Sequence, residues 1–302
     1  MKDIYAEITN NIIDELDKGN IPWAKPWVSL YNNGNVARSY TTGKPYSLLN
    51  QLMLGRPGEY ITFNQCKELG GHVKKGAHSK MVVFWKLYKT DKKDAEGNYV
   101  TDENGAVVAE TIPVLRYYQV FHIEDCEGIT PKFEITVNPM PGTELQKIED
   151  AERVLTEYVN RENITLDIVS GTDDAYYSPS LDLIHIPALE QYKAANEYYS
   201  TAFHEMTHST GHAGRLNRLS SDKNAAFGSA EYSKEELTAE LGSCMILATL
   251  GIDTMTSFRN SAAYIQSWLS VLRNDKKLIV GAAARAEKAV KFIFGNAEDE
   301  EE

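Results

Sequence analysis

The sequence His204-Glu205-Met206-Thr207-His208 decides the fold of the second half of this 302-residue chain. Two histidines four residues apart lie on one face of a helix, so both imidazole rings can bind a single metal ion. Glu205 follows the first histidine and can accept a proton from a metal-bound water, whose pKa zinc lowers to about 7. The pattern predicts a helical zinc site of the metallopeptidase type. Its expected parts are the ligands His204 and His208 and the general base Glu205.

A catalytic zinc needs a third protein ligand and one position left open for water and substrate. Position 214, where a metzincin has its third histidine, is a glycine, and His212 lies too far along the helix to reach the same ion. The next helix offers carboxylates instead, because Glu236 and Glu240 share one helical face. Glu236 precedes Ala239-Glu240 in an order similar to glutamate-type zincins, in which the ligand precedes Ala-Asp. We therefore assign Glu236 as the ligand and Glu240 as the group that orients a ligand histidine, with Glu235 and Glu240 as alternative ligands.

The segment upstream of the predicted metal helix is typical of a strand. Zincins place in this position the edge strand that pairs with an extended peptide, and backbone pairing of that kind holds a substrate regardless of its sequence. We expect Leu183–Ile186 to be this edge strand. His185 is expected to be packed or exposed and inert, since single histidines are usually structural.

The net charge of −12 hides an asymmetry along the chain. Residues 1–133 hold 16 Lys and Arg against 16 Asp and Glu, whereas residues 134–302 hold 15 against 27. Within the first half, residues 18–93 carry 13 basic side chains and only three acidic ones. Such a stretch can attract a polyanion although the whole chain is acidic.

Composition excludes several classes of protein. A hydrophobic content of 42% with 10% aromatic residues indicates globular packing, and no apolar run approaches the length that crosses a bilayer. The N-terminus lacks the features of a secretory signal. Cys66, Cys126 and Cys244 are too far apart in the sequence for a disulfide framework or a Cys-x-x-Cys metal site. We expect a soluble cytoplasmic protein with reduced thiols and no membrane partner.

Hydrophobic periodicity predicts an α+β chain of two domains. Helices are expected at 3–18, 45–54, 62–69, 144–160, 189–212, 233–250, 258–273 and 276–294, and strands at 81–88, 114–121, 166–169 and 182–187. Turn residues between the first two strands predict an exposed hairpin extension at 89–112. The proline-rich segment 125–143 is the best linker candidate. This gives an N-terminal α+β domain at 1–134, a mostly helical domain at 135–296 and an acidic tail at 297–302.

The N-terminal half interleaves aromatic with basic side chains. Aromatic rings can stack on unpaired bases while lysines and arginines contact phosphates, which is the physics of sequence-tolerant binding to single strands. The candidate DNA-binding residues are Trp23, Lys25, Trp27, Arg38, Lys44, Tyr46, Lys74 and Lys75.

Two groups of motifs occur in order along the chain. The first comprises Pro22-Trp23, Pro26-Trp27, Thr42-Gly43-Lys44-Pro45-Tyr46, Thr62-Phe63-Asn64-Gln65 and residues 70–76. It resembles the N-terminal domain of ArdC-type antirestriction proteins, which is similar to the single-stranded-DNA-binding part of plasmid TraC-type primases. The second comprises Tyr177-Ser178-Pro179 and residues 182–187, 204–212, 215–218 and 235–242. It resembles the zincin-like metallopeptidase domain of the same family.

The resemblance implies a protein of conjugative plasmids or related mobile elements that binds incoming single-stranded DNA and protects it from host restriction. One Zn²⁺ per chain is expected. In the first hypothesis the zincin domain acts on, or merely docks, host proteins such as restriction enzymes. In the second, the chain is a DNA-dependent metalloprotease that cleaves other DNA-bound proteins. In the third, the zinc is structural and the chain coats single-stranded DNA without being an enzyme.

Overall fold

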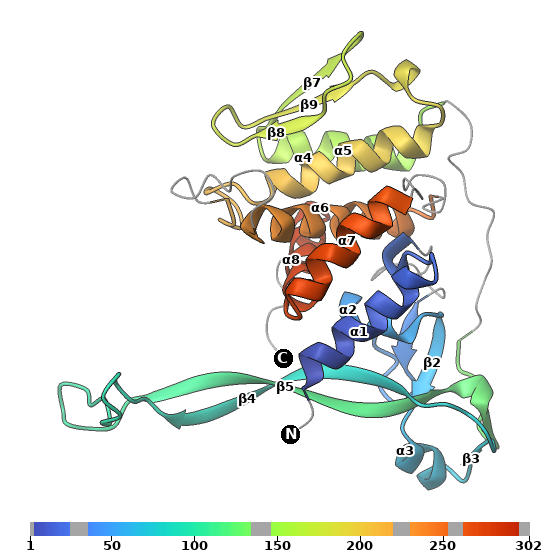
Figure 1. Ribbon diagram of the computed structural model, residues 1–302, viewed down its shortest axis with the longest axis vertical. Coiled ribbons are helices and arrows are strands. Elements are labelled where there is room, and N and C mark those ends of the chain that lie inside the picture. The colour runs from blue at the N-terminus through green and yellow to red at the C-terminus, as the bar shows by residue number, and fades with distance from the viewer. Residues whose placement is uncertain (1–2, 25–35, 134–145, 220–229, 253–261, 296–302) are drawn as a thin grey trace.

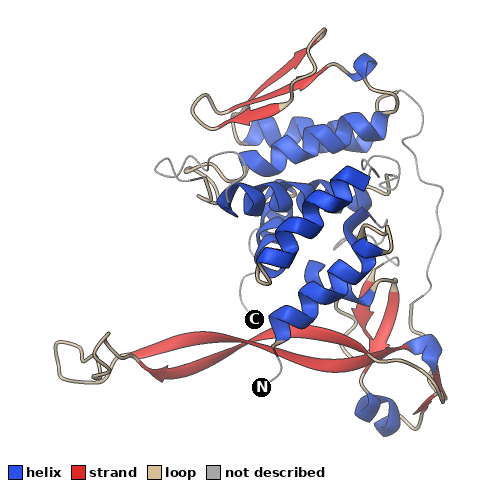
Figure 2. Ribbon diagram, in the orientation of Figure 1, coloured by secondary structure: helices blue, strands red, loops and turns tan. Residues whose placement is uncertain are grey.

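The computed structural model describes residues 3–24, 36–133, 146–219, 230–252 and 262–295. The predicted DNA-binding residues Lys25 and Trp27, the domain boundary near residue 135 and the acidic tail lie outside these stretches. The described residues combine helices with small sheets (Figure 2), as expected for an α+β chain. No helix among them is long and apolar enough to cross a membrane.

The N-terminal helix forms where periodicity predicts it. Helix α1 (Ile4–Asp17) buries Ile8, Ile12 and Leu16, which recur every four residues on one face. The side chain of Asp3 accepts a hydrogen bond from the backbone N–H of Ala6 and so caps the first turn. This helix therefore presents one apolar face to the rest of the molecule.

A four-stranded sheet with the order β1-β2-β5-β4 supports the N-terminal half (Figure 1). Strands β1 (Ala37–Ser39) and β2 (Gly58–Ile61) are parallel, and β4 (Lys80–Asp91) and β5 (Ala109–His122) are antiparallel. The last two form a long twisted hairpin that projects from the body of the molecule, with its far end at residues 92–108. The exposed hairpin extension predicted from the turn residues is confirmed.

Short elements surround this sheet. Helix α2 (Leu48–Leu54) begins three residues later than expected, whereas α3 (Phe63–Glu68) begins behind a capping box formed by Thr62 and Gln65. Strands β3 (His72–Val73) and β6 (Cys126–Glu127) make a separate antiparallel pair. All three cysteines of the chain are buried and free.

The C-terminal half stacks a small sheet on a layer of helices (Figure 1). Its elements are α4 (Glu149–Arg161), β7 (Thr165–Val169), β8 (Tyr176–Ser178), β9 (Leu183–Pro187), α5 (Ala195–Ser209), α6 (Ala230–Thr249), α7 (Ala262–Asn274) and α8 (Leu278–Ile293). Helix α5 is shorter than the predicted helix at 189–212. The first residues of the predicted helix instead form a short 3-10 turn at Leu189–Gln191, and α5 begins at Ala195.

The strand expected at the edge of the small sheet is its central strand. The order of the small sheet is β7-β9-β8, so β9 is central, with a parallel neighbour on one side and an antiparallel one on the other. The prediction that Leu183–Ile186 forms the edge strand is therefore wrong. The chain turns back between Ser178 and Leu183, where Asp182 has a left-handed φ of 46°, and β8 thereby pairs with β9.

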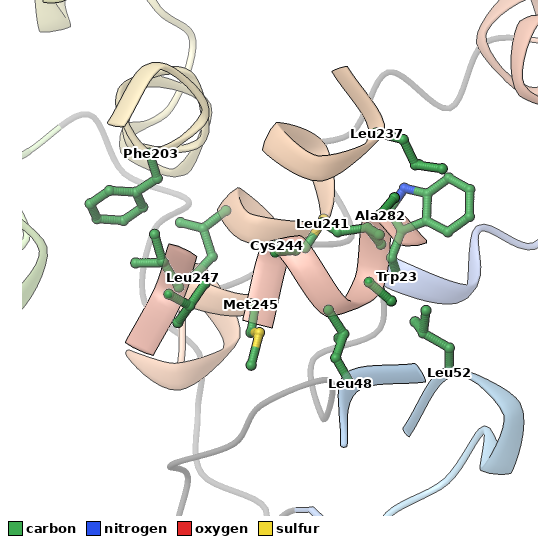
Figure 3. Packing of buried hydrophobic residues seen from close by; sticks show 14 of the residues in the cluster. Trp23, Leu48, Leu52, Phe203, Leu237, Leu241, Cys244, Met245, Leu247 and Ala282 are labelled. Atoms are coloured by element: carbon green, nitrogen blue, oxygen red, sulfur yellow. The ribbon is translucent and has the colours of Figure 1, made fainter. Parts of the chain in front are cut away.

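One apolar core joins the two halves of the chain. Figure 3 shows Trp23, Leu48 and Leu52 of the N-terminal half beside Leu241 and Ala282 of the C-terminal helices. Burial of large side chains from both halves in one cluster stabilises their contact, because apolar area removed from water contributes about 25 cal/mol per Å². The two halves therefore share a hydrophobic core.

Trp23 lies at the centre of this shared core. Its side chain is 0% exposed, and its ring meets the edge of Trp268 with centroids 6.3 Å apart. This burial removes Trp23 from the DNA-binding set predicted from the sequence, because its ring has no exposed face on which a base can stack. Trp23 lies in a 3-10 turn at Pro22–Ala24, and its ring contributes by packing rather than by exposure.

Candidate metal centre

Helices α5 and α6 bring three potential metal ligands together. His204 and His208 project from α5 towards Glu236 on α6. The Nε2 atoms of the two histidines are 3.1 Å apart, and each lies 3.5 Å from an oxygen of Glu236. All the potential ligand atoms lie within 4.8 Å of one another. The three side chains that the sequence nominates as ligands thus converge on one point, with Glu236 rather than Glu235 or Glu240 completing the group.

The donor chemistry of this group fits a transition-metal ion. Two imidazole nitrogens and one carboxylate oxygen form the set that catalytic zinc sites of the metallopeptidase type use, and they leave further coordination positions for water. Imidazole also suits other first-row divalent ions, so the donors alone select a class of metal rather than one element. We therefore describe the centre as a divalent-metal site.

The remaining imidazole nitrogens are held by carboxylates. The Nδ1 atom of His204 lies 3.4 Å from Glu240, and the Nδ1 atom of His208 lies 3.3 Å from Glu235. A carboxylate at Nδ1 fixes the orientation of the ring and leaves the Nε2 lone pair available for a metal. Glu240 thus lies where the sequence places an orienting group, and Glu235, proposed as an alternative ligand, occupies the equivalent position for the second histidine.

Arg218 fixes the position of Glu235, the carboxylate that contacts His208. Its guanidinium donates to both carboxylate oxygens of Glu235, at 2.8 Å and 3.2 Å. It also donates to the backbone carbonyl of Thr207 at 2.8 Å and to the hydroxyl of Thr210 at 2.7 Å, both near the end of α5. One buried arginine therefore ties α6 to α5 through the carboxylate that orients His208.

The electrostatics of the site favour a bound cation. Burial alone lowers the pKa of His204, but Glu236, Glu240 and the charge of Glu205 together raise it to about 10. Burial raises the pKa of Glu235, yet its contacts with His208 and Arg218 hold it at about 2. The carboxylates around the two imidazole rings thus stabilise positive charge, and a bound divalent ion can supply that charge.

Two further side chains accompany the ligands. Glu205, the predicted general base, is only 7% exposed on α5. Tyr232 lies one turn before Glu236 on α6, and burial together with the charges of Glu236 and Glu205 raises its pKa. The Tyr232 hydroxyl also hydrogen-bonds Glu236 and helps to lower the pKa of that carboxyl group. The sequence assigns no site role to Tyr232, which only its i, i+4 spacing from Glu236 could have indicated, and it marks Arg218 only as part of the motif at residues 215–218.

Close approach of α5 and α6 depends on a glycine. A Cβ atom added to Gly242 would lie 2.6 Å from the Cγ2 atom of Thr207, nearer than side-chain atoms normally approach. Any larger residue therefore has to push the two helices apart. Because one helix carries the histidines and the other the glutamates, this contact sets the distance between the two sets of ligands.

Two other histidines lie apart from the centre. His212 follows the end of α5, and its Nδ1 atom accepts a hydrogen bond from the backbone of Gly214. His185 on β9 contacts Asp167 at 2.8 Å and stacks on the ring of Tyr176. Both residues thus have local structural contacts, in line with the roles expected from the sequence.

The candidate DNA-binding residues that the structure describes differ in exposure. Lys44, Lys74 and Lys75 are exposed, whereas Arg38 and Tyr46 are each 9% exposed. The guanidinium of Arg38 lies over the ring of Phe133 at 4.2 Å. The lysines can therefore meet a polyanion directly, whereas Arg38 and Tyr46 expose little surface to one.

Two family models match the chain. The model described as the N-terminal domain of anti-restriction factor ArdC matches residues 2–121, and a zincin-like metallopeptidase model matches residues 156–285. The metal-free crystal structure of the antirestriction ArdC protein from plasmid R388 superposes with a TM-score of 0.72 at 31% identity, covering 100% of both chains. This chain belongs to the ArdC antirestriction family.

The same R388 protein has also been solved with Mn(II) bound, and that structure matches with a TM-score of 0.70 at 30% identity, over 99% of this chain and 100% of the other. An uncharacterized protein, y4eC, from Sinorhizobium fredii is 32% identical over 98% of this chain and 93% of its own length. A DNA primase TraC from Escherichia coli is 33% identical over 97% of this chain. The chain spans only 20% of that primase, so the likeness concerns one part of it.

Proposed function

We propose that this ArdC-family chain binds single-stranded DNA through its N-terminal half and carries a zinc metallopeptidase site in its C-terminal half. In the cell it would protect DNA of a mobile element from restriction in the cytoplasm. The observation that carries the enzymatic part is the convergence of His204, His208 and Glu236 beside Glu205. The Mn(II)-bound R388 protein supports a divalent ion in this fold. We propose zinc as the physiological metal because of the imidazole and carboxylate donors.

The chemistry then follows from the positions of the side chains. His204, His208 and Glu236 would hold the ion, which supplies Lewis acidity and a water of lowered pKa when bound. Glu205 accepts a proton at its carboxylate and passes it to the leaving amine. Glu240 and Glu235 keep the two imidazole rings oriented, and Tyr232 holds Glu236 through its hydroxyl.

The DNA-binding part rests on charge and exposure. The exposed side chains of Lys44, Lys74 and Lys75 belong to the basic stretch of the N-terminal half and can contact phosphates. The similarity to a part of the TraC primase supports a nucleic-acid partner. Proteins that bind single strands without sequence preference combine such charges with aromatic rings, and the exposed Phe63 and Trp85 offer rings of this kind.

The test compares protection by the intact chain and by Glu205→Gln. Unmodified single-stranded plasmid DNA is transferred into restricting and non-restricting recipient cells that express either form, and established transformants are counted. Wild-type protein is expected to raise establishment in the restricting cells alone. Loss of this effect in Glu205→Gln supports a catalytic role of the site, whereas full protection by the variant would contradict it. Absence of protection by the wild type would contradict the antirestriction role itself.

A second candidate function is DNA-dependent proteolysis of other DNA-bound proteins. The observation that favours it is the apolar core shared by the two halves, since bound DNA then contacts a unit that includes the metal helices. In this case proteolysis of an added DNA-binding protein rises when single-stranded DNA is present and disappears in Glu205→Gln. Proteolysis that ignores DNA would contradict this candidate.

A further inference from the structure

A cavity of about 420 Å³ opens where the β4–β5 hairpin meets α2 and α8. Its volume lies in the range of about 300–1,000 Å³ that is typical of ligand pockets. Its lining includes the aromatic residues Phe84, Trp85 and Tyr118 of the hairpin and Lys288 and Lys291 of α8. Both halves of the chain therefore contribute to one cavity.

The aromatic rings of this cavity are unusually exposed. Phe84, Trp85 and Tyr118 are 42%, 49% and 39% exposed. The rings of Phe84 and Tyr118 are tilted against each other with centroids 5.5 Å apart. Large rings left open to water at a concave site indicate a partner that covers them.

The aromatic surface continues outwards along the hairpin. Phe84, Lys86 and Tyr88 alternate on one face of β4, and the register places Arg116 of β5 opposite Phe84 on the same face. The Arg116 guanidinium lies 5.4 Å from the centroid of the Tyr88 ring and donates to its hydroxyl, and the Lys86 ammonium lies 5.2 Å from the same centroid. Rings and cations thus alternate from the cavity towards the end of the hairpin.

Helix α8 adds positive charge from the C-terminal half. Glu287 of α8 accepts a hydrogen bond at 3.0 Å from the backbone N–H of Leu48, which holds α8 against the first turn of α2. Lys288 follows on the exposed side, and the Lys291 ammonium lies 3.6 Å from Glu287, one turn further along. The two lysines line the same cavity as the aromatic rings.

We propose that this cavity binds an unpaired base of single-stranded DNA. The base stacks on the ring of Trp85, Lys288 and Lys291 contact the adjoining phosphates, and the strand then crosses the outer edge of β4 to Phe84, Lys86 and Arg116 on the other face of the hairpin. This inference rests on the proposed single-stranded-DNA binding and assigns a site to it, one to which α8 contributes. Stacking on aromatic rings accepts any base, whereas a duplex keeps its bases paired and has none to insert.

Bound DNA at this site touches α8, a helix that packs against one of the two helices of the metal centre. Helix α8 packs against α6, where Arg285 of α8 donates to the hydroxyl of Thr238 at 3.2 Å. Thr238 lies between Glu236 and Glu240 in the sequence of α6. A strand in the cavity therefore rests on the helix that buttresses two of the metal-site carboxylates.

The test uses a fluorescein-labelled 20-mer of dT and fluorescence anisotropy with the full chain. Trp85→Ala is expected to weaken binding at least roughly fivefold, since stacking of one base contributes that much in comparable sites. Lys288→Gln with Lys291→Gln is expected to weaken binding and to flatten the plot of log K against log salt by about 1.4, or 0.7 per phosphate contact. Unlabelled duplex should compete poorly.

Matched controls separate the site from general effects. Tyr99→Ala removes an exposed aromatic ring outside the cavity, and Lys147→Gln with Arg153→Gln removes two exposed charges, one just before α4 and one on it. Both controls should bind as the wild type does. A second signal is direct: dT should quench tryptophan fluorescence in the wild type, and Trp85→Phe should abolish most of that quenching.

The outcomes distinguish this site from the proposed function. If the wild type does not bind dT at all, the proposed single-stranded-DNA binding fails and this site fails with it. If the wild type binds but the Trp85 and Lys288/Lys291 variants bind equally well, with quenching retained in Trp85→Phe, the DNA lies elsewhere and only the cavity assignment is overturned. Equal competition by duplex would also overturn it.

Discussion

The α5–α6 helix pair and the β4–β5 hairpin use polar and aromatic side chains in opposite ways. Around the metal centre, the side chains of His208, Glu235 and Arg218 are 13%, 15% and 9% exposed, and Glu235 contacts both of the others. On the hairpin, Phe84 and Trp85 are 42% and 49% exposed. The first region is preorganised around a point, as a small ion requires, whereas the second offers a long open surface, as a flexible strand requires.

The largest effect is expected where the preorganised region is opened. Arg218→Ala leaves the carboxylate of Glu235 buried without its guanidinium, so His208 loses a fixed orientation. Loss of such supporting contacts typically costs about 10- to 100-fold in metal affinity, and we expect a decrease of this size in competition titrations with a chelator. Arg218→Lys keeps the positive charge but loses the planar guanidinium, so its metal affinity should lie between those of the wild type and Arg218→Ala.

A control on the surface completes this prediction. Arg273 forms an exposed pair with Asp17, far from the metal centre in the sequence and on α7. Arg273→Ala should leave metal affinity unchanged. Equal affinity of the wild type and Arg218→Ala would mean that the ligands hold their geometry without this arginine.

An intermediate effect is expected at the helix contact. Gly242→Ala forces a methyl group against Thr207, and overpacking of this kind destabilises by about 1–3 kcal/mol. The melting temperature measured by calorimetry should therefore fall. Gly281→Ala on α8 is the matched control, because its added Cβ lies 3.6 Å from the nearest atom and helical alanine is favoured over glycine by up to about 1 kcal/mol.

The same melting experiment sharpens the comparison between the regions. Trp85→Ala on the hairpin removes a large ring, yet its melting temperature should stay near that of the wild type because about half of the ring already contacts water. A large decrease for Trp85→Ala, or none for Gly242→Ala, would mean that the two regions are not distinguished in the way described.

The smallest effect concerns the pH dependence of stability. Burial raises the pKa of Asp182, but hydrogen bonds from Arg215 and Tyr177 outweigh it and hold the pKa below its ordinary value. A lowered folded-state pKa stabilises above the unfolded value of 3.8, and this contribution is lost as the pH falls through the lower folded-state pKa. Asp182→Asn should therefore be less stable than the wild type at neutral pH.

Acid unfolding curves test this prediction. The difference between wild type and Asp182→Asn in free energy of unfolding should shrink as the pH falls below about 4, where the unfolded carboxyl group titrates. A difference that stays constant down to the acid limit would show that the aspartate acts through its shape and not through its charge.

Much of the fold could be predicted because its signals are local. Helices α1 and α3 follow from the spacing of apolar residues and from the Thr62 capping box, and the hairpin follows from its turn residues. Strands β1, β2 and β8 were missed, since three or four residues show no clear alternation. Their pairing depends on partners far away in the sequence.

The residues of the metal site also differ in how far the sequence predicts them. His204, Glu205 and His208 occur within one turn of a single helix, so their arrangement can be predicted from spacing alone. Arg218 reaches Glu235 only after the chain has folded back between α5 and α6, and no local pattern marks that contact. Trp23 was misassigned for the converse reason, because an aromatic ring near basic residues in the sequence is typical of a stacking surface, whereas in the structure the ring packs in the core against Trp268 of α7.

The central claim is that His204, His208 and Glu236 hold one zinc ion, and the most direct test is the metal content of the purified chain by native mass spectrometry. We predict one zinc per chain in the wild type and loss of the ion in both His204→Ala and Glu236→Ala. Retention of zinc in Glu236→Ala, or a wild type that binds no divalent ion, would contradict the ligand set and with it the metallopeptidase part of the account.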